Sequence, residues 1–233
     1  MKNILAAAAL LLAACGNQQT EQSPAEAQSP ESAAIEEAAP IAPAAEATSP
    51  PPATLADGFA WPETKTRAKL VTSFGDVAVE LYPDKAPETV ANFLRYAANG
   101  HYDRVIFHRV VPGFVVQTGG YSRTFIERPT GNPIPYEGDN GLPNYRTTLA
   151  MARTPDPASA TSQFYINLSD NHEELDHFVN DLGPRYGYAV FGRVIEGMEV
   201  IDAIGAVRTG PGGPFEAEVP VEPVMLIRVD LVE

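Results

Sequence analysis

Four polar side chains stand out because they lie among aromatic residues in two stretches of the sequence. FHRVVPGFVVQTGG holds Arg109 and Gln117 on either side of a Pro-Gly turn, and LAMARTPDPASATSQFYINLSDN holds Arg153 and Gln163. Arginine stays protonated at any relevant pH and donates from a planar fork, and glutamine both donates and accepts hydrogen bonds. Preorganised donors of this kind stabilise charge or lone pairs that develop during a reaction.

Strand alternation leaves the orientation of Arg109 open. Arg109 shares its parity with Val105, Phe107 and Val111, on a face where an unpaired buried charge is costly. In the alternative, Arg109 lies on the solvent face of a barrel, while His108 and the residues at every second position from it point inward. Alternation by itself does not choose between the two.

Other catalytic chemistries lack their residues. The chain has no Gly-rich phosphate loop ending in Lys-Ser/Thr and no Gly-x-Ser-x-Gly elbow. In HEELDH, His172 and His177 are one residue too far apart for the zinc-binding H-E-x-x-H pattern, which places both histidines on one helical face. We therefore expect no metal site here and a solvent-exposed turn instead.

Periodicity predicts a mainly β fold with two helices. RAKLVTSFGDVAVELYPD alternates like a hairpin of half-buried strands, with Gly75 and Asp76 as its turn. KAPETVANFLRYAANG predicts an amphipathic helix between Pro87 and Gly100. Further strands are expected at 105–111, 114–117, 147–153, 162–168, 188–195 and 223–232, with a loop over 121–146 and a second helix over 197–205. Many strands and few helices favour a closed all-β barrel with helical covers.

The first fifteen residues, MKNILAAAALLLAAC, predict a signal segment. They combine one positive charge with an apolar run that is too short to span a membrane. Leu12 to Cys15 resemble the lipobox of bacterial lipoproteins, in which the cysteine is lipidated; an ordinary signal peptide with an incidental cysteine is the alternative. Because two or more acyl chains anchor stably, we expect attachment to a membrane, facing the periplasm. Gly16 resembles the sorting signal for the outer rather than the inner membrane.

Residues 16–60 have a composition that predicts a disordered tether. They are rich in Ala, Pro, Glu, Ser and Gln and contain no basic residue. A binding segment that recruits a partner is the alternative. Residues 61–233 are then one domain with its own core. The net charge of −14 argues against nucleic acid as a partner.

The two polar-bearing stretches, together with YAVFGRVIEGMEVIDAI, resemble the signature blocks of the cyclophilins, a family of peptidyl-prolyl cis-trans isomerases. MART, SATSQF and DNGLPN are typical of the bacterial periplasmic branch. The resemblance runs from about Arg67 to the C-terminus. It implies an eight-stranded antiparallel barrel capped by two α-helices, with a substrate groove on its outside and no cofactor.

The same resemblance implies a role for each site residue. Arg109 is the catalytic arginine, Phe114 a wall of the proline pocket, and Gln117 the support of the arginine and of the substrate carbonyl. The other implied substrate-binding residues are His108, Val115, Ala152, Arg153, Thr154, Gln163, Tyr165, Leu175 and Tyr188.

The sequence departs from the family pattern after residue 171. Glu174 stands where many eukaryotic members have a tryptophan before the pocket leucine. The following segment, HFVNDLGPRYG, is longer than usual, so Phe178 is an alternative to Leu175 as pocket wall. Trp61, the only tryptophan, precedes the part of the chain that resembles the family and reaches this place only if the N-terminal arm folds back.

The chemistry of X-Pro bonds suits these residues. Amide resonance gives a rotation barrier of about 18–20 kcal/mol. A guanidinium that donates to the prolyl nitrogen as it becomes pyramidal stabilises the twisted amide more than the planar one, without nucleophile or metal. We therefore predict a monomeric isomerase that acts through Arg109 on proline-containing, unfolded or folding exported polypeptides. The alternative is a proline-peptide binding module or holdase with little turnover.

Overall fold

The computed structural model describes residues 61–63 and 65–232. The predicted signal segment, Cys15 and the predicted tether lie outside these residues. Within the part described, no helix is both long enough and apolar enough to cross a membrane.

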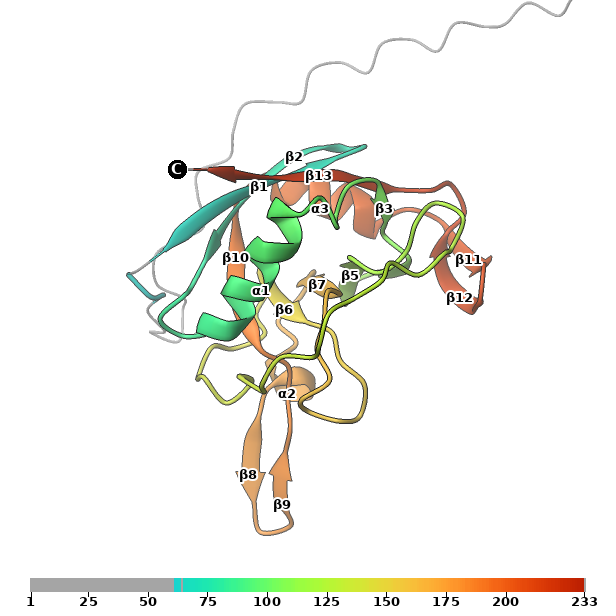
Figure 1. Cartoon of the computed structure of the whole chain (residues 1–233). Coiled ribbons are helices and arrows are strands. Elements are labelled where there is room, and N and C mark those ends of the chain that lie inside the picture. The colour runs from blue at the N-terminus through green and yellow to red at the C-terminus, as the bar shows by residue number, and fades with distance from the viewer. Residues whose placement is uncertain (1–60, 64, 233) are drawn as a thin grey trace, which may run out of the picture. The chain divides into compact units, whose positions relative to one another are not determined.

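One curled sheet of nine strands dominates the domain (Figure 1). In their hydrogen-bonded order the strands are β3 (Val105–Ile106), β13 (Met225–Val232), β1 (Thr66–Thr72), β2 (Gly75–Leu81), β10 (Val190–Glu196), β6 (Thr148–Met151), β7 (Phe164–Asn167), β5 (Val115–Thr118) and β4 (Arg109–Val111). All neighbours pair antiparallel. The predicted mainly β class is confirmed.

The strand count differs from the expected eight because one predicted strand is split. β3 and β4, at the two ends of the sheet, are separated in sequence only by Phe107 and His108. β3 pairs with β13 and β4 with β5. The two ends of the curled sheet are therefore formed by neighbouring parts of one chain segment. These two end strands do not pair with each other, as the strands of a closed eight-stranded barrel would.

The two predicted helices cover the core of this sheet. α1 (Pro87–Ala98) contributes Val90, Phe93 and Ala97, and α3 (Met198–Gly205) contributes Ile201 and Ile204, all to one hydrophobic cluster with the strands. Full burial of a valine, isoleucine or phenylalanine side chain contributes about 1.5–3 kcal/mol. The helix spacing read from the sequence is confirmed.

The first hairpin turns two residues earlier than predicted. Thr72 pairs with Gly75, which leaves Ser73 and Phe74 as the loop. The Thr72 hydroxyl donates to the Gly75 carbonyl at 2.7 Å and accepts from the Phe74 amide at 3.1 Å, so a threonine side chain organises the turn. Gly75 instead begins β2, with a φ of +137° that favours glycine.

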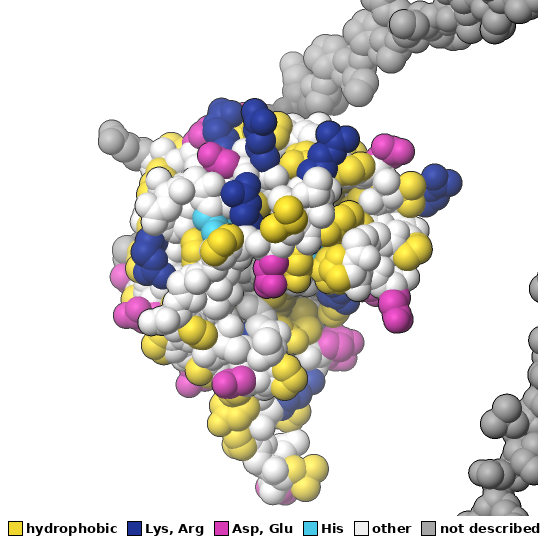
Figure 2. All heavy atoms as spheres, turned by 45° about the vertical axis from the view of Figure 1, so that its right-hand side comes forward, with side chains coloured by type: hydrophobic (Ala, Val, Ile, Leu, Met, Phe, Trp, Pro, Cys, Tyr) yellow, Lys and Arg dark blue, Asp and Glu magenta, His cyan; other side chains and the backbone are white. Residues whose placement is uncertain are grey.

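One short helix and two small hairpins were not predicted. The HEELDH turn is a single helical turn, α2 (His172–Leu175), without buried residues. Two small hairpins are added, β8 (Phe178–Asn180) with β9 (Gly183–Arg185) and β11 (Thr209–Gly212) with β12 (Phe215–Pro220). The β8–β9 hairpin projects from the rest of the domain (Figure 1, Figure 2).

Trp61 folds back onto the sheet. It is 8% exposed, stacks on Tyr82 at 5.8 Å between ring centroids, and lies under the Arg193 guanidinium at 4.6 Å. The Tyr82 hydroxyl and the Arg193 Nε both donate to Glu80 Oε1 at 2.8 Å. Burial alone raises the pKa of Glu80, but these two hydrogen bonds, together with the positive charges of Arg193 and Lys65, outweigh it, and the net shift is downward. A buried ion pair therefore supports the tryptophan.

Candidate active site

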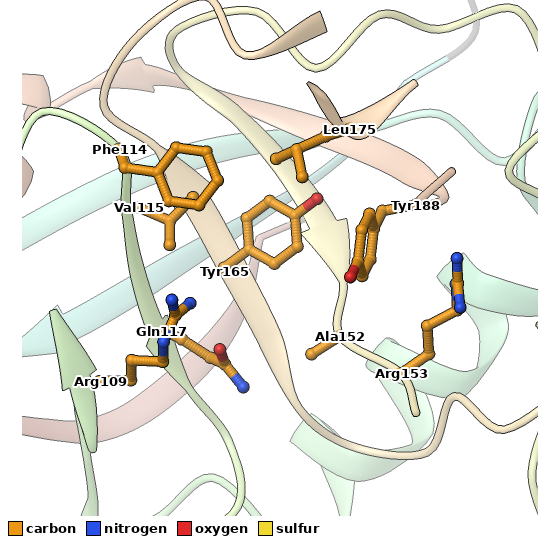
Figure 3. Close-up of a pocket in the computed structure, with 9 residues that line it drawn as sticks. All are labelled: Arg109, Phe114, Val115, Gln117, Ala152, Arg153, Tyr165, Leu175 and Tyr188. Carbon is orange, nitrogen blue, oxygen red and sulfur yellow. The ribbon is translucent and has the colours of Figure 1, made fainter. Parts of the chain in front are cut away.

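A cavity of about 260 Å³ collects most of the residues that the sequence singled out (Figure 3). Its lining consists of Arg109, Phe114, Val115, Gln117, Ala152, Arg153, Tyr165, Leu175 and Tyr188. A second cavity shares Gln117, Ala152 and Arg153 with the first and adds the predicted Thr154 and Gln163. Together the two cavities form a continuous groove with an apolar and a polar part.

The β4–β5 hairpin brings the two polar residues of the first stretch together. Arg109 pairs directly with Gln117, and Val111 pairs with Val115, so the loop between the strands has three residues. Gly113 in this loop has a φ of +72°, which explains the glycine of the Pro-Gly turn. The turn thus places Phe114, its last residue, at the cavity.

Strand pairing decides the orientation that alternation left open. Gln117 pairs with Arg109 on one side and with Tyr165 on the other, and directly paired residues point to the same face. Val110 and Val116, their neighbours in sequence, are fully buried in the core. Arg109 therefore lies on the outer face, as in the second of the two orientations considered.

The apolar part of the groove rests on a buried tyrosine. Tyr165 is 4% exposed, and its hydroxyl donates to Asn144 Oδ1 at 2.9 Å. Burial raises the pKa of Tyr165, so the phenol stays neutral. Asn144 is itself fully buried and donates from its backbone and side chain to Asp176 Oδ1 at 2.7 and 2.8 Å. Sequence reasoning missed Asn144 as a site residue, although it ends the DNGLPN motif.

The polar part pairs its residues differently from the expectation. Gln117, expected to support Arg109, lies beside it in Figure 3, but the Gln117 side-chain amide donates to Gln163 Oε1 at 3.0 Å. The Arg109 Nε donates instead to Glu218 Oε2 at 2.7 Å. A Cβ at Gly120 would lie 2.7 Å from the side-chain amide of Gln163, so a glycine at this position leaves room for that side chain.

Comparison with known proteins identifies the family. The model of the cyclophilin type peptidyl-prolyl cis-trans isomerases matches residues 67–230. The chain belongs to this family. Peptidyl-prolyl cis-trans isomerase A of Dickeya dadantii is 47% identical over 163 residues, which are 70% of this chain and 83% of that protein. Peptidyl-prolyl cis-trans isomerase B of Escherichia coli is 45% identical over 162 residues, 70% of this chain and 97% of that protein.

Solved structures agree on the fold of this cyclophilin. A cyclophilin type peptidyl-prolyl cis-trans isomerase of Cryptosporidium parvum matches with a TM-score of 0.58 at 23% identity, over 73% of this chain and 99% of that one. At this identity the likeness speaks for the fold alone. The enzyme class rests on the family match and on the more similar bacterial isomerases, and the chain is a cyclophilin-type peptidyl-prolyl cis-trans isomerase.

The cyclophilin's pocket wall is Leu175 rather than Phe178. Leu175 lines the cavity, and its carbonyl accepts from the Tyr188 amide at 2.9 Å. Phe178 is 40% exposed on β8, with the Arg185 guanidinium 4.3 Å from its ring. Trp61, although it folds back, does not line the cavity. The segment between Leu175 and Tyr188 forms the β8–β9 hairpin, and both of these flanking residues line the cavity.

The groove rim at Arg153 is fixed by backbone carbonyls. Arg153 donates from Nε to the Gly187 carbonyl at 3.0 Å and also to the carbonyl of Tyr186. Its guanidinium lies 4.7 Å from the ring centroid of Tyr188. Arg153 therefore ties the segment that precedes Tyr188 to the groove.

His108, which the resemblance implies as a substrate-binding residue, is buried and lies outside the lining of both cavities. It is 2% exposed and stands in the two-residue gap between β3 and β4. Its ring stacks on Phe215 at 5.6 Å and meets Tyr121 edge to face at 4.8 Å. Burial lowers the pKa of His108 to about 4, so the ring is neutral at physiological pH.

This burial predicts a pH-dependent stability. Because the pKa of His108 is about 4 in the folded protein and about 6.5 in an unfolded chain, only the unfolded state binds this proton between these values. Stability therefore rises with pH across this window, and acidification from pH 7 to 4 costs about 3 kcal/mol through His108. Urea unfolding of the wild type and of His108→Phe between pH 4 and 7 measures it. The same pH slope in both proteins contradicts the assignment.

Proposed function

We propose that this cyclophilin accelerates X-Pro rotation in exported polypeptides through Arg109. The observation that carries the proposal is the cross-strand row of Arg109, Gln117 and Tyr165, which ends at an apolar pocket. In Figure 3 the Arg109 guanidinium is turned toward Val115 in that pocket. A prolyl ring seated there presents its nitrogen to a charged donor.

The pocket and the arginine have separate tasks. Phe114, Val115, Tyr165 and Leu175 offer the ring an apolar surface that binds the planar and twisted forms alike. Arg109 discriminates between them, because the prolyl nitrogen has a lone pair free to accept a hydrogen bond only when the amide is twisted. An acceleration of about 10⁵ corresponds to roughly 7 kcal/mol.

Removing the guanidinium is the direct test of this role. A single preorganised donor to a transition state contributes about 10²–10³ in rate, so Arg109→Ala is expected to lose that much kcat on a proline tetrapeptide. NMR exchange measures the isomerisation, and titration of the same peptide checks that binding is retained. Arg228→Ala, an arginine paired with Asp230 on β13, is the matched control. Equal turnover in Arg109→Ala and wild type contradicts the mechanism.

The proposal places the enzyme on a membrane facing the periplasm, the outer membrane in a Gram-negative cell. It is supported by the apolar N-terminal run, the lipobox-like residues before Cys15 and the glycine at position 16. Exported polypeptides with X-Pro bonds are then the substrates within reach. Cys15 would hold the lipid, and the domain from Trp61 onward would carry out the catalysis.

Lipidation at Cys15 predicts where the protein is found. In a Gram-negative host, the full chain is expected in outer-membrane fractions and to incorporate labelled palmitate. Cys15→Ser is expected to lose the label and the membrane attachment, while its turnover on a proline tetrapeptide stays at the wild-type level. Retention of Cys15→Ser in the membrane fraction, or a wild type without label, contradicts the anchor.

A further inference from the structure

The Arg109 guanidinium donates a hydrogen bond to Glu218, a β12 residue that lines neither groove cavity. The Nε···Oε2 distance is 2.7 Å, and the two side chains are 37% and 43% exposed. Exposed ion pairs contribute little to stability. Because Nε is the guanidinium nitrogen nearest the backbone, its hydrogen bond leaves the two terminal nitrogens free to face the cavity.

Glu218 keeps this contact in an unfavourable backbone conformation. Its φ is +67°, in the left-handed region that glycine and asparagine tolerate and glutamate does not favour. Backbone strain of this kind persists where the surroundings enforce it, and it clusters at functional sites. Because the ion pair is exposed, it stabilises the fold too little to offset this strain. The strained backbone therefore points to a functional role for the Glu218 carboxylate.

The strand that carries Glu218 is anchored behind Arg109. Phe215 of β12 stacks on His108, the residue before Arg109, and meets Tyr121 edge to face at 5.2 Å. Val219, directly after Glu218, is buried. The carboxylate is therefore held between two fixed points.

We propose that Glu218 is a positioning residue for isomerisation. It fixes the Nε of Arg109, so that the terminal nitrogens face the prolyl nitrogen before the substrate arrives. An arginine side chain has several rotatable bonds, and ordering it in advance removes that entropy loss from the catalytic step. A carboxylate also weakens the positive field of the guanidinium; in this proposal the gain in orientation is larger. The inference rests on the proposed role of Arg109.

Three substitutions of Glu218 separate positioning from a structural role. Glu218→Ala and Glu218→Gly are expected to lower kcat about tenfold with KM nearly unchanged, because orientation acts on the transition state. Glu218→Gln keeps an oxygen that accepts from Nε and is expected to retain most of the activity. Glu218→Gly relieves the strained φ, so it is expected to be slow although its thermal midpoint equals or exceeds that of the wild type.

Controls distinguish this inference from the proposed function. Glu216→Ala, an exposed acidic residue of the same strand, is expected to have wild-type turnover. In Arg109→Ala, the further substitution Glu218→Ala is expected to cost nothing. Wild-type or faster turnover in Glu218→Ala overturns the positioning role, whereas unchanged turnover in Arg109→Ala overturns the proposed mechanism itself.

The β8–β9 hairpin supports an independent inference. It exposes Phe178, Val179, Leu182 and Tyr186, at 40%, 70%, 97% and 45% of their surface. Apolar atoms mark this projection in Figure 2. Among the described residues its strands pair only with each other, so their outer edges keep unpaired backbone groups.

The base of this hairpin belongs to the groove. Leu175 and Tyr188, which flank it, both line the cavity and are joined by a backbone hydrogen bond. The Arg185 guanidinium donates to the carbonyls of Glu173 at 2.7 Å and Asp176 at 3.1 Å. The apolar tip is thus tied to the groove by a fixed stem.

We infer that the hairpin docks an extended apolar stretch of the same polypeptide whose proline occupies the groove. Its continuity with the groove selects this occupant, since a chain leaving the pocket next to Leu175 and Tyr188 meets the hairpin. Exposed strand edges and apolar side chains are the two features that bind extended peptides. The inference rests on the proposed isomerase function.

Two substrates of different length test the hairpin. Val179→Ser combined with Leu182→Ser is expected to leave turnover of a proline tetrapeptide unchanged. It is expected to slow the catalysed refolding of a reduced, carboxymethylated protein with a rate-limiting proline about three- to tenfold, through loss of the second contact. Leu231→Ser, at a 50% exposed position of β13, is the control. Equal effects on both substrates, or an effect only on self-association in sedimentation, overturn the inference.

Discussion

The site depends on one constraint, namely that the strand which carries Arg109 also closes the hydrophobic core. Val110 is fully buried while Arg109 faces outward. Just before them, Phe107 and His108 are both buried, so alternation is interrupted and the strand divides into β3 and β4. Because of this interruption, the segment from β3 to β4 contributes side chains to the core and still presents the Arg109 guanidinium to the groove.

Two arginine–glutamate pairs serve this arrangement in opposite ways. Arg193 and Glu80 are 7% and 3% exposed and support the Tyr82–Trp61 stack. Trp61 and Tyr82 belong to a hydrophobic cluster that also contains Val115 and therefore reaches the pocket. Removing one partner of such a pair strands a buried charge, which is strongly destabilising. Arg109 and Glu218 are exposed, so their pairing contributes mainly geometry.

Residue types and local patterns predicted much of the fold and of the groove. α1 and α3, the alternating strands and most groove residues follow from spacing and from the signature blocks. The orientation of Arg109 could not be derived, because it depends on cross-strand pairing with Gln117. The burial of His108 could not be derived either, because Phe107 beside it is buried as well and the alternation is broken there.

Long-range contacts were the second source of error. Glu218 lies in GPGGPFEAEVP, which resembles a loop, and neither its φ nor its contact with Arg109, 109 positions away, leaves a local signal. The return of Trp61 to Tyr82 and Arg193 is equally invisible in the sequence. Local patterns therefore predict which residues reach the groove better than how those residues are held there.

Burial fixes the protonation states of two side chains next to the groove. Burial keeps Tyr165 neutral and lowers the pKa of His108 to about 4, while an arginine side chain stays charged. Arg109 is therefore the constant positive charge, and the ring next to it in sequence adds no second one near neutral pH. A buried histidine that charged easily would repel the guanidinium and weaken the core beneath β4. The low pKa of His108 thus keeps a second positive charge away from Arg109 near neutral pH, and protonation of His108 in acid acts on the stability of the fold.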